Sequence, residues 1–81
     1  MIKRAHIRHF LAVADSGSFS QAAARLHVTQ PTVSTAIAEL ERLGGSALFV
    51  RDRRHVRRTD PGGAFLPIAR DLEAGFRRAD Q

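Results

Sequence analysis

The chain has 81 residues, enough for one small domain, and 13 basic against 8 acidic side chains give it a formal net charge of +5. It has no cysteine, which excludes a disulfide framework and a thiolate metal site. It also lacks an apolar run of the roughly 20 residues that span a bilayer and an apolar segment typical of a secretory signal, so we expect a soluble, cytoplasmic protein without a membrane partner.

An amphipathic helix is predicted over about residues 3–15. Its apolar side chains follow the spacing i, i+3, i+4 and i+7 of one helical face, namely Ile7, Phe10, Leu11 and Ala14. Gly17 is placed to end this helix in a left-handed conformation. We expect the helix to contribute to the core and little else.

Two further helices follow, separated only by residues 27–29. Ser18 and Gln21 fit a capping box at the start of the first, and Thr29 with Pro31 fits the start of the second. His27 occupies the turn position where glycine is usual, and histidine tolerates a left-handed backbone better than most residues. Two helices joined by so tight a turn are typical of a helix-turn-helix. Gly44 and Gly45 are expected to end its second helix.

Residues 48–51 and 56–59 are expected to form two short strands around a basic tip. Five arginines fall within eight residues, namely Arg51, Arg53, Arg54, Arg57 and Arg58. A hairpin directly after a helix-turn-helix is the wing of a winged helix, where basic side chains meet the phosphate backbone or a minor groove. A solvated charge run is the alternative interpretation of the arginines.

A last helix is predicted over residues 60–81, capped by Thr59 or Asp60. Its apolar positions step by 4, 3, 4 and 3 residues, as in a coiled coil, at Phe65, Ala69, Leu72, Phe76 and Ala79. We expect these five residues to form a homodimer interface, with packing on their own domain as the alternative. The helical pattern continues to Gln81, so we expect either the N-terminal part of a longer protein or a natural short form.

These segments together resemble the DNA-binding domain of LysR-type transcriptional regulators. The resemblance rests on GSFSQAAARLHVTQPTVS at residues 17–34, followed at the expected distances by Leu40-Glu41, Gly45, Leu48-Phe49, Arg51, Thr59 and Gly62. It implies a mainly α fold: a winged helix-turn-helix over residues 1–59, then a linker and dimerisation helix over residues 60–81. The sequence departs from the family pattern at Gly44 and Arg58, where leucine is usual, and at Pro61, where alanine is common.

The resemblance also implies double-stranded DNA as the partner, bound by a dimer on an interrupted inverted repeat. It places DNA contacts on the recognition helix at Gln30, Pro31, Ser34 and Thr35. Since that helix face carries mostly small residues, we expect few direct base contacts, with Gln30 the best candidate for reading an adenine. Contacts to the backbone or minor groove are expected at Ser18, Ser20, Thr29, Thr32, Arg51, Arg53 and Arg54, and at Arg4 or Arg8.

Catalysis, a metal site and a cofactor are not expected. His6 and His9 are three residues apart but have no nearby carboxylate or cysteine in sequence, so we interpret them as surface or interface histidines. A small-molecule effector is expected only in a longer form. Two alternatives stay open: a dimerisation module with weak nucleic-acid binding, and non-specific binding, which the absence of Tyr and Trp disfavours because base stacking needs exposed aromatic rings.

Overall fold

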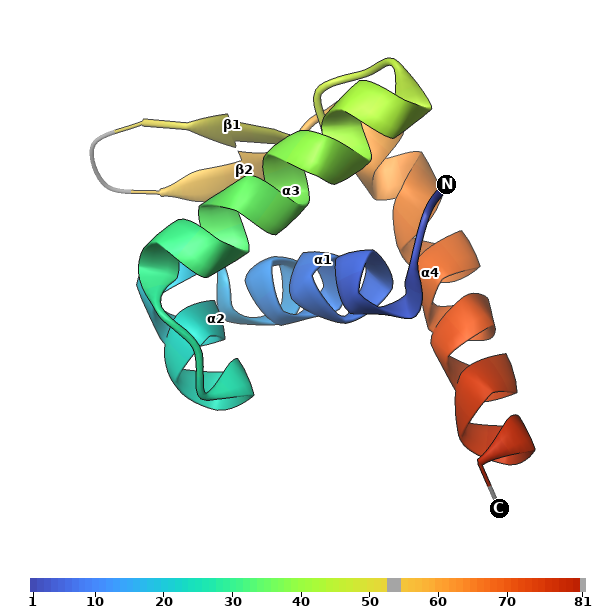
Figure 1. Ribbon diagram of the computed structural model, residues 1–81. Helices are drawn as coiled ribbons and strands as arrows, with labels where there is room; N and C mark the ends of the chain where they lie inside the picture. Colours follow the sequence, from blue (N-terminus) through green and yellow to red (C-terminus); the bar gives the residue numbers. More distant parts are fainter. Residues whose placement is uncertain (53–54, 81) are drawn as a thin grey trace.

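The computed structural model describes residues 1–52 and 55–80 (Figure 1). In chain order these residues form α1 (Arg4–Ser16), α2 (Phe19–Leu26), α3 (Gln30–Gly44), β1 (Phe49–Arg51), β2 (Val56–Arg58) and α4 (Asp60–Ala79). The two strands pair antiparallel, with Val50 opposite Arg57. The predicted mainly α winged helix-turn-helix with a long C-terminal helix is confirmed.

Side-chain caps fix where three of the helices begin. In each, the hydroxyl of the N-cap residue accepts a backbone N–H from three residues further on, as seen for Ser18 with Gln21 (3.1 Å), Thr29 with Thr32 (3.4 Å) and Thr59 with Gly62 (3.0 Å). The second half of the predicted capping box differs from expectation, because the backbone N–H of Ser18 donates to the hydroxyl of Ser16 at 3.3 Å. The predicted left-handed turn at His27 is confirmed, with φ 58° and ψ 43°.

The core forms around α1, which packs against each of the other three helices. The Phe10 ring lies at its centre, with ring centroids 5.2 Å from Phe49 of β1 and 5.0 Å from Phe65 of α4. Phe19 of α2 extends this aromatic group, its centroid 6.2 Å from that of Phe49. Such tilted and edge-on pairs stabilise beyond their area alone. The wing and the last helix are therefore parts of the same core as the helix-turn-helix.

Glu41 and Leu48 join the wing to the helices. One carboxylate oxygen of Glu41 accepts the backbone N–H groups of Leu48 (2.7 Å) and Phe49 (3.3 Å), both buried residues. The Leu48 carbonyl in turn accepts the N–H of Thr59, which caps α4, at 3.0 Å. The end of α3, the start of β1 and the start of α4 thus share one hydrogen-bonded junction.

The first half of α4 packs on its own domain. Ala69 is fully buried, and Phe65 is partly buried against Phe10. Ala69 therefore has no surface to offer a second chain, and its predicted place in a dimer interface is wrong. Further along the helix, Leu72 and Phe76 remain 43% and 38% exposed.

Two ion pairs hold α4 against α1. Arg70 of α4 pairs with Asp15 at 2.7 Å, and Arg4 at the start of α1 pairs with Glu73 at 3.1 Å. The Glu73 side chain is only 10% exposed, and its hydrogen bond to Arg4 lowers its pKa below the ordinary carboxyl value. The two pairs thus join α4 to both ends of α1.

Candidate nucleic-acid interface

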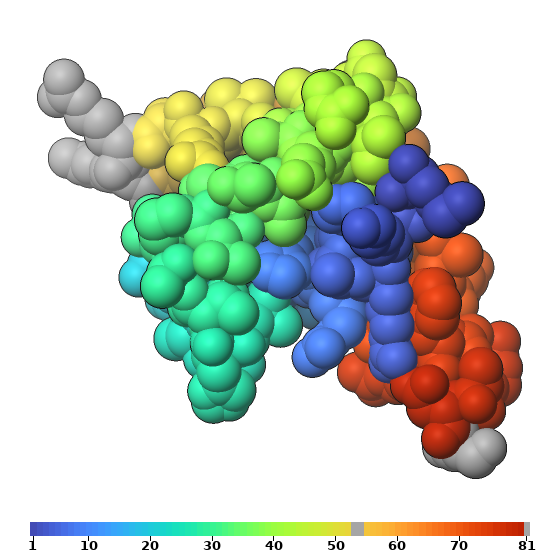
Figure 2. Space-filling view, viewed as in Figure 1, coloured from blue at the N-terminus to red at the C-terminus, as the bar shows by residue number. Residues whose placement is uncertain are grey.

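Helix α3, the predicted recognition helix, lies on the surface of the domain, beside the wing (Figure 2). Its predicted base-contacting residues Gln30, Pro31 and Thr35 are exposed, and Ser34 is half-buried. Beyond Gln30, the longer polar side chains on the exposed part of the helix are Glu39 and Arg42. The first two turns of α3 are therefore small enough to approach a groove closely, as the sequence predicts.

Arg51 of the wing contacts both helices of the helix-turn-helix. Its guanidinium carbon lies 3.6 Å from the centroid of the Phe19 ring, and its Nη2 donates to the Ser34 hydroxyl at 3.1 Å. Stacking on an aromatic face and a hydrogen bond both restrict a side chain that would otherwise be flexible. The guanidinium carries five N–H donors, so most remain for a ligand. The fold thus brings two predicted contact residues together and holds the charged one in place.

A groove of about 220 Å³ lies next to this guanidinium. It is formed by the start of α2, including Ser18 and Ser20, together with Gln30, Arg51 and His55. Asp52 also lines it, and its carboxylate accepts the backbone N–H of His55 at 2.7 Å. The groove therefore gathers hydroxyl, amide and guanidinium donors that come from three separate elements.

The two helix N-termini at this surface differ in what they offer an anion. The first N–H groups of a helix have no partner within the helix. At α3, Pro31 has no N–H and the N–H of Thr32 is already capped by Thr29. At α2, the Ser18 hydroxyl accepts the N–H of Gln21. The N–H groups of Phe19 and Ser20 lie nearer the start of the helix, at the end that lines the groove. A phosphate would find more free donors at α2.

The rest of the wing is basic on its exposed side. Arg57 and Arg58 of β2 are both exposed. Arg53 and Arg54, which the sequence predicts as backbone or minor-groove contacts, lie outside the described residues. The predicted contribution of the hairpin tip therefore stays a prediction.

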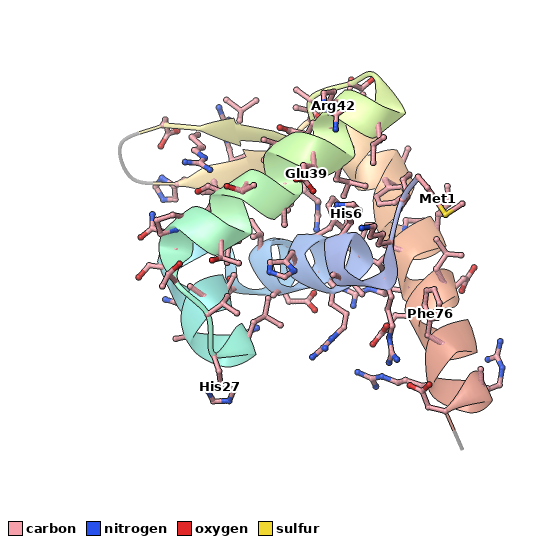
Figure 3. All side chains as sticks on the ribbon, viewed as in Figure 1. Met1, His6, His27, Glu39, Arg42 and Phe76 are labelled. Carbon is pink, nitrogen blue, oxygen red and sulfur yellow. The ribbon has the colours of Figure 1, made fainter. Side chains whose placement is uncertain are left out.

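Buried His6 corrects a sequence-based interpretation. The residue is 5% exposed rather than a surface histidine. Its Nδ1 accepts the backbone N–H of Lys3 at 2.9 Å, so its Nε2–H donates to the Glu39 carboxylate, also at 2.9 Å (Figure 3). This hydrogen bond lowers the pKa of Glu39. His6 therefore caps α1 and holds it against α3. The two partners are 33 positions apart in the sequence, so spacing arguments did not predict this contact.

Arg4, predicted as a possible phosphate contact, is engaged within the protein, and its contact with DNA stays a prediction. Its guanidinium is paired with Glu73 and Asp80, and its central carbon lies 5.3 Å from the centroid of the Phe76 ring. Arg4 thus joins α1 to the second half of α4. Arg8, the other candidate, lies in a groove between α1 and α4 to which neither α3 nor the wing contributes. His9 donates from Nδ1 to the Ala5 carbonyl at 2.7 Å.

Comparison with known proteins identifies this arrangement. The model of bacterial regulatory helix-turn-helix proteins of the lysR family matches residues 5–63. The chain belongs to this family. In keeping with this, its relatives are named transcriptional regulators, and the chain is a DNA-binding domain rather than an enzyme. Among the residues described, no helix is both long and apolar enough to cross a membrane.

The similarity extends to solved complexes with DNA. The structure of the CbnR DNA-binding domain with DNA matches at a TM-score of 0.89 and 38% identity, covering 96% of this chain and 91% of that one. The BenM DNA-binding domain on catB site 1 DNA matches at 0.90 and 34% identity, covering 95% and 86%. These complexes support DNA binding by a domain of this family.

Curated relatives match the chain over only part of their own length. The Hca operon transcriptional activator HcaR of Escherichia coli is 46% identical over 64 residues, which are 79% of this chain and 22% of HcaR. A regulator of Azotobacter vinelandii from the ibpB-leuC intergenic region is 52% identical over 65 residues, 80% of this chain and 45% of that protein. The chain thus spans less than half the length of these relatives.

Proposed function

We propose that this LysR-family domain binds double-stranded DNA as a homodimer, in the cytoplasm, with α3 in the major groove and the wing on the backbone or minor groove. A symmetric dimer would present two α3 helices to an interrupted inverted repeat. The observation that carries the proposal is the position of Arg51, which is stacked on Phe19 and bonded to Ser34 beside the exposed start of α3. This position places the positive charge of Arg51 beside the part of α3 that would contact the bases.

In this proposal different residues supply affinity and sequence preference. Arg51 and the donors at the start of α2 would hold one phosphate in the groove between α2 and the wing. Gln30, which lines the same groove, would read a base edge, and Pro31 and Thr35 would contact a thymine methyl group. The exposed apolar residues Leu72 and Phe76 of α4 would contribute to the dimer. Control by a small molecule would belong to a longer form.

The test starts by selecting preferred duplexes from a random library and then titrating salt on the best duplex and on a scrambled one. Arg51→Ala should weaken binding to both and lower the salt slope by roughly one unit, since one phosphate contact is lost. Gln30→Ala should instead change the ranking of operator variants. Arg8→Ala removes the same charge away from the interface and should leave the slope unchanged.

Two results would count against the proposal. Equal affinity of the unmodified chain for selected and scrambled duplexes would favour a dimerisation module with weak, non-specific binding. An unchanged slope for Arg51→Ala would remove Arg51 from the phosphate contacts. Because Arg51 also stacks on Phe19, the unfolding midpoint of each variant is measured alongside, so that lost binding is not confused with lost fold.

A further inference from the structure

The groove between α2 and the wing also contains an imidazole, that of His55, to which the contacts described above give no role. We call this groove the Arg51 groove. Its polar lining comes from three elements, namely Ser18 and Ser20 of α2, Gln30 of α3, and Arg51, Asp52 and His55 of the hairpin. The His55 side chain is 70% exposed, so a ligand bound in the groove can reach it.

Two hydrogen bonds fix His55 relative to Asp52. The backbone N–H of Asp52 donates to the His55 carbonyl at 3.0 Å, and the backbone N–H of His55 donates to the Asp52 carboxylate at 2.7 Å. The imidazole Nδ1 lies 3.9 Å from the same carboxylate oxygen, close enough for an ion pair but too far for a hydrogen bond. Because both hydrogen bonds use the backbone of residue 55, its side chain can be exchanged without losing either.

The charge in the Arg51 groove depends on the protonation of His55. Among the described residues that line the groove, Arg51 and Asp52 are the other charged ones, and those from α2 and α3 are uncharged. With a neutral imidazole, the charges of Arg51 and Asp52 offset each other, and the carboxylate opposes an anion bound at the guanidinium. A protonated imidazole leaves one positive charge in excess and supplies an N–H donor for a charge-assisted hydrogen bond.

We propose that protonated His55 is a phosphate-binding residue of the Arg51 groove and makes DNA affinity depend on pH. This contact rests on the proposed function, in which Arg51 holds a DNA phosphate in the same groove. Histidine changes its charge between about pH 5 and 8, whereas a DNA phosphate stays anionic. DNA binding should therefore take up protons, and the affinity should fall as the pH rises. Since phosphate contacts carry no sequence information directly, the change should be the same on selected and scrambled duplexes.

The test compares dissociation constants for DNA at about pH 6 and about pH 8, at constant ionic strength. The unmodified chain should bind roughly two- to fivefold more tightly at the lower pH, the factor expected for one exposed charge contact. His55→Asn should lose this difference and bind at both pH values as weakly as the unmodified chain does at the higher one. His55→Lys keeps a positive charge throughout and should bind tightly at both, which a purely structural role of His55 would not produce.

His27→Asn is the matched control, because it removes the same chemical group outside the groove. His27 lies at the opposite end of α2 from the residues that line the groove (Figure 3). Asparagine tolerates the left-handed backbone that His27 adopts, so this variant should fold and retain the full pH difference. His6 and His9 are present in every variant, so differences between the variants isolate the contribution of residue 55.

Three outcomes would overturn this role of His55 and leave the proposed function standing. The affinity of the unmodified chain could be independent of pH, or His55→Asn could keep the full pH difference. His55→Lys could also bind no more tightly than His55→Asn at the higher pH. In each case a lower salt slope for Arg51→Ala would still support a phosphate at the guanidinium. An unchanged slope for Arg51→Ala would instead remove the shared phosphate contact, and with it both proposals for this groove.

Discussion

Gly62 and Gly63 are adjacent residues for which the structure predicts opposite effects of the same substitution. A Cβ added at Gly62 would lie 2.0 Å from the carbonyl oxygen of Leu48 and 3.0 Å from its carbonyl carbon. The obstacle is backbone, and it is held in place because the same carbonyl accepts the N–H of Thr59. Gly62→Ala can therefore be accommodated only if the start of α4 moves away from β1. At Gly63, an added Cβ would meet nothing within 4 Å.

The two substitutions should change the unfolding free energy in opposite directions. Forcing one methyl group into a packed site costs typically 1–3 kcal/mol, and a backbone obstacle puts Gly62→Ala near about 3 kcal/mol of lost unfolding free energy. For a domain of this size, that lowers the melting temperature by roughly 12–24 °C. It is a large part of the total stability, which for 81 residues is on the order of 4–12 kcal/mol. Gly63→Ala should add about 0.5–1 kcal/mol, because alanine favours a helix over glycine.

Thermal melts followed by circular dichroism, repeated as urea titrations, measure both variants against the unmodified chain. The comparison is matched, since both substitutions have the same chemistry and lie in the first turns of one helix. If the two variants shifted stability by the same amount, the close contact between α4 and β1 could not be the cause. An unchanged melting temperature for Gly62→Ala would show that the junction relaxes without cost.

Two further substitutions test the contacts that position the wing and α4. Glu41→Ala should lower the unfolding free energy measured in urea by about 2–4 kcal/mol, because it leaves two N–H groups of buried residues without their acceptor. Glu41→Gln should recover part of this loss, since its amide oxygen can accept the same N–H groups. Equal losses for the two variants would show that the charge alone matters. For Glu73, Arg4 lowers the folded-state pKa below the ordinary 4.5, so the carboxylate stabilises the fold above that pH and its contribution disappears as the pH falls through the folded-state value. Glu73→Gln should therefore be less stable than the unmodified chain at pH 7 and lose less stability on acidification, and parallel pH profiles would contradict the assignment.

Local signals in the sequence predicted most of the fold. The caps at Ser18, Thr29 and Thr59 and the left-handed turn at His27 depend on residues within three or four positions of one another. Such features are visible to spacing arguments because the interacting groups are fixed by helix geometry alone. The order of the elements followed from them.

The contacts that the sequence did not predict join elements far apart in the chain. Arg4 meets Glu73 across 69 residues, and His6 meets Glu39 across 33. A helical wheel assigns a polar residue to a face but cannot say which other helix will cross that face. The spacing of Phe65, Ala69, Leu72 and Phe76 shows the same limit: one apolar stripe is shared between the domain's own core and an exposed surface, and periodicity does not mark where one gives way to the other.

For the proposed dimer, the junction at Leu48 decides how firmly α4 is held relative to α3. Exposed ion pairs such as Arg70 with Asp15 contribute only about 0–1 kcal/mol. The contact of Gly62 with the Leu48 carbonyl and the burial of Ala69 involve close packing that a change of angle would disrupt. Rigid packing, rather than the ion pairs, would therefore fix the distance between two recognition helices.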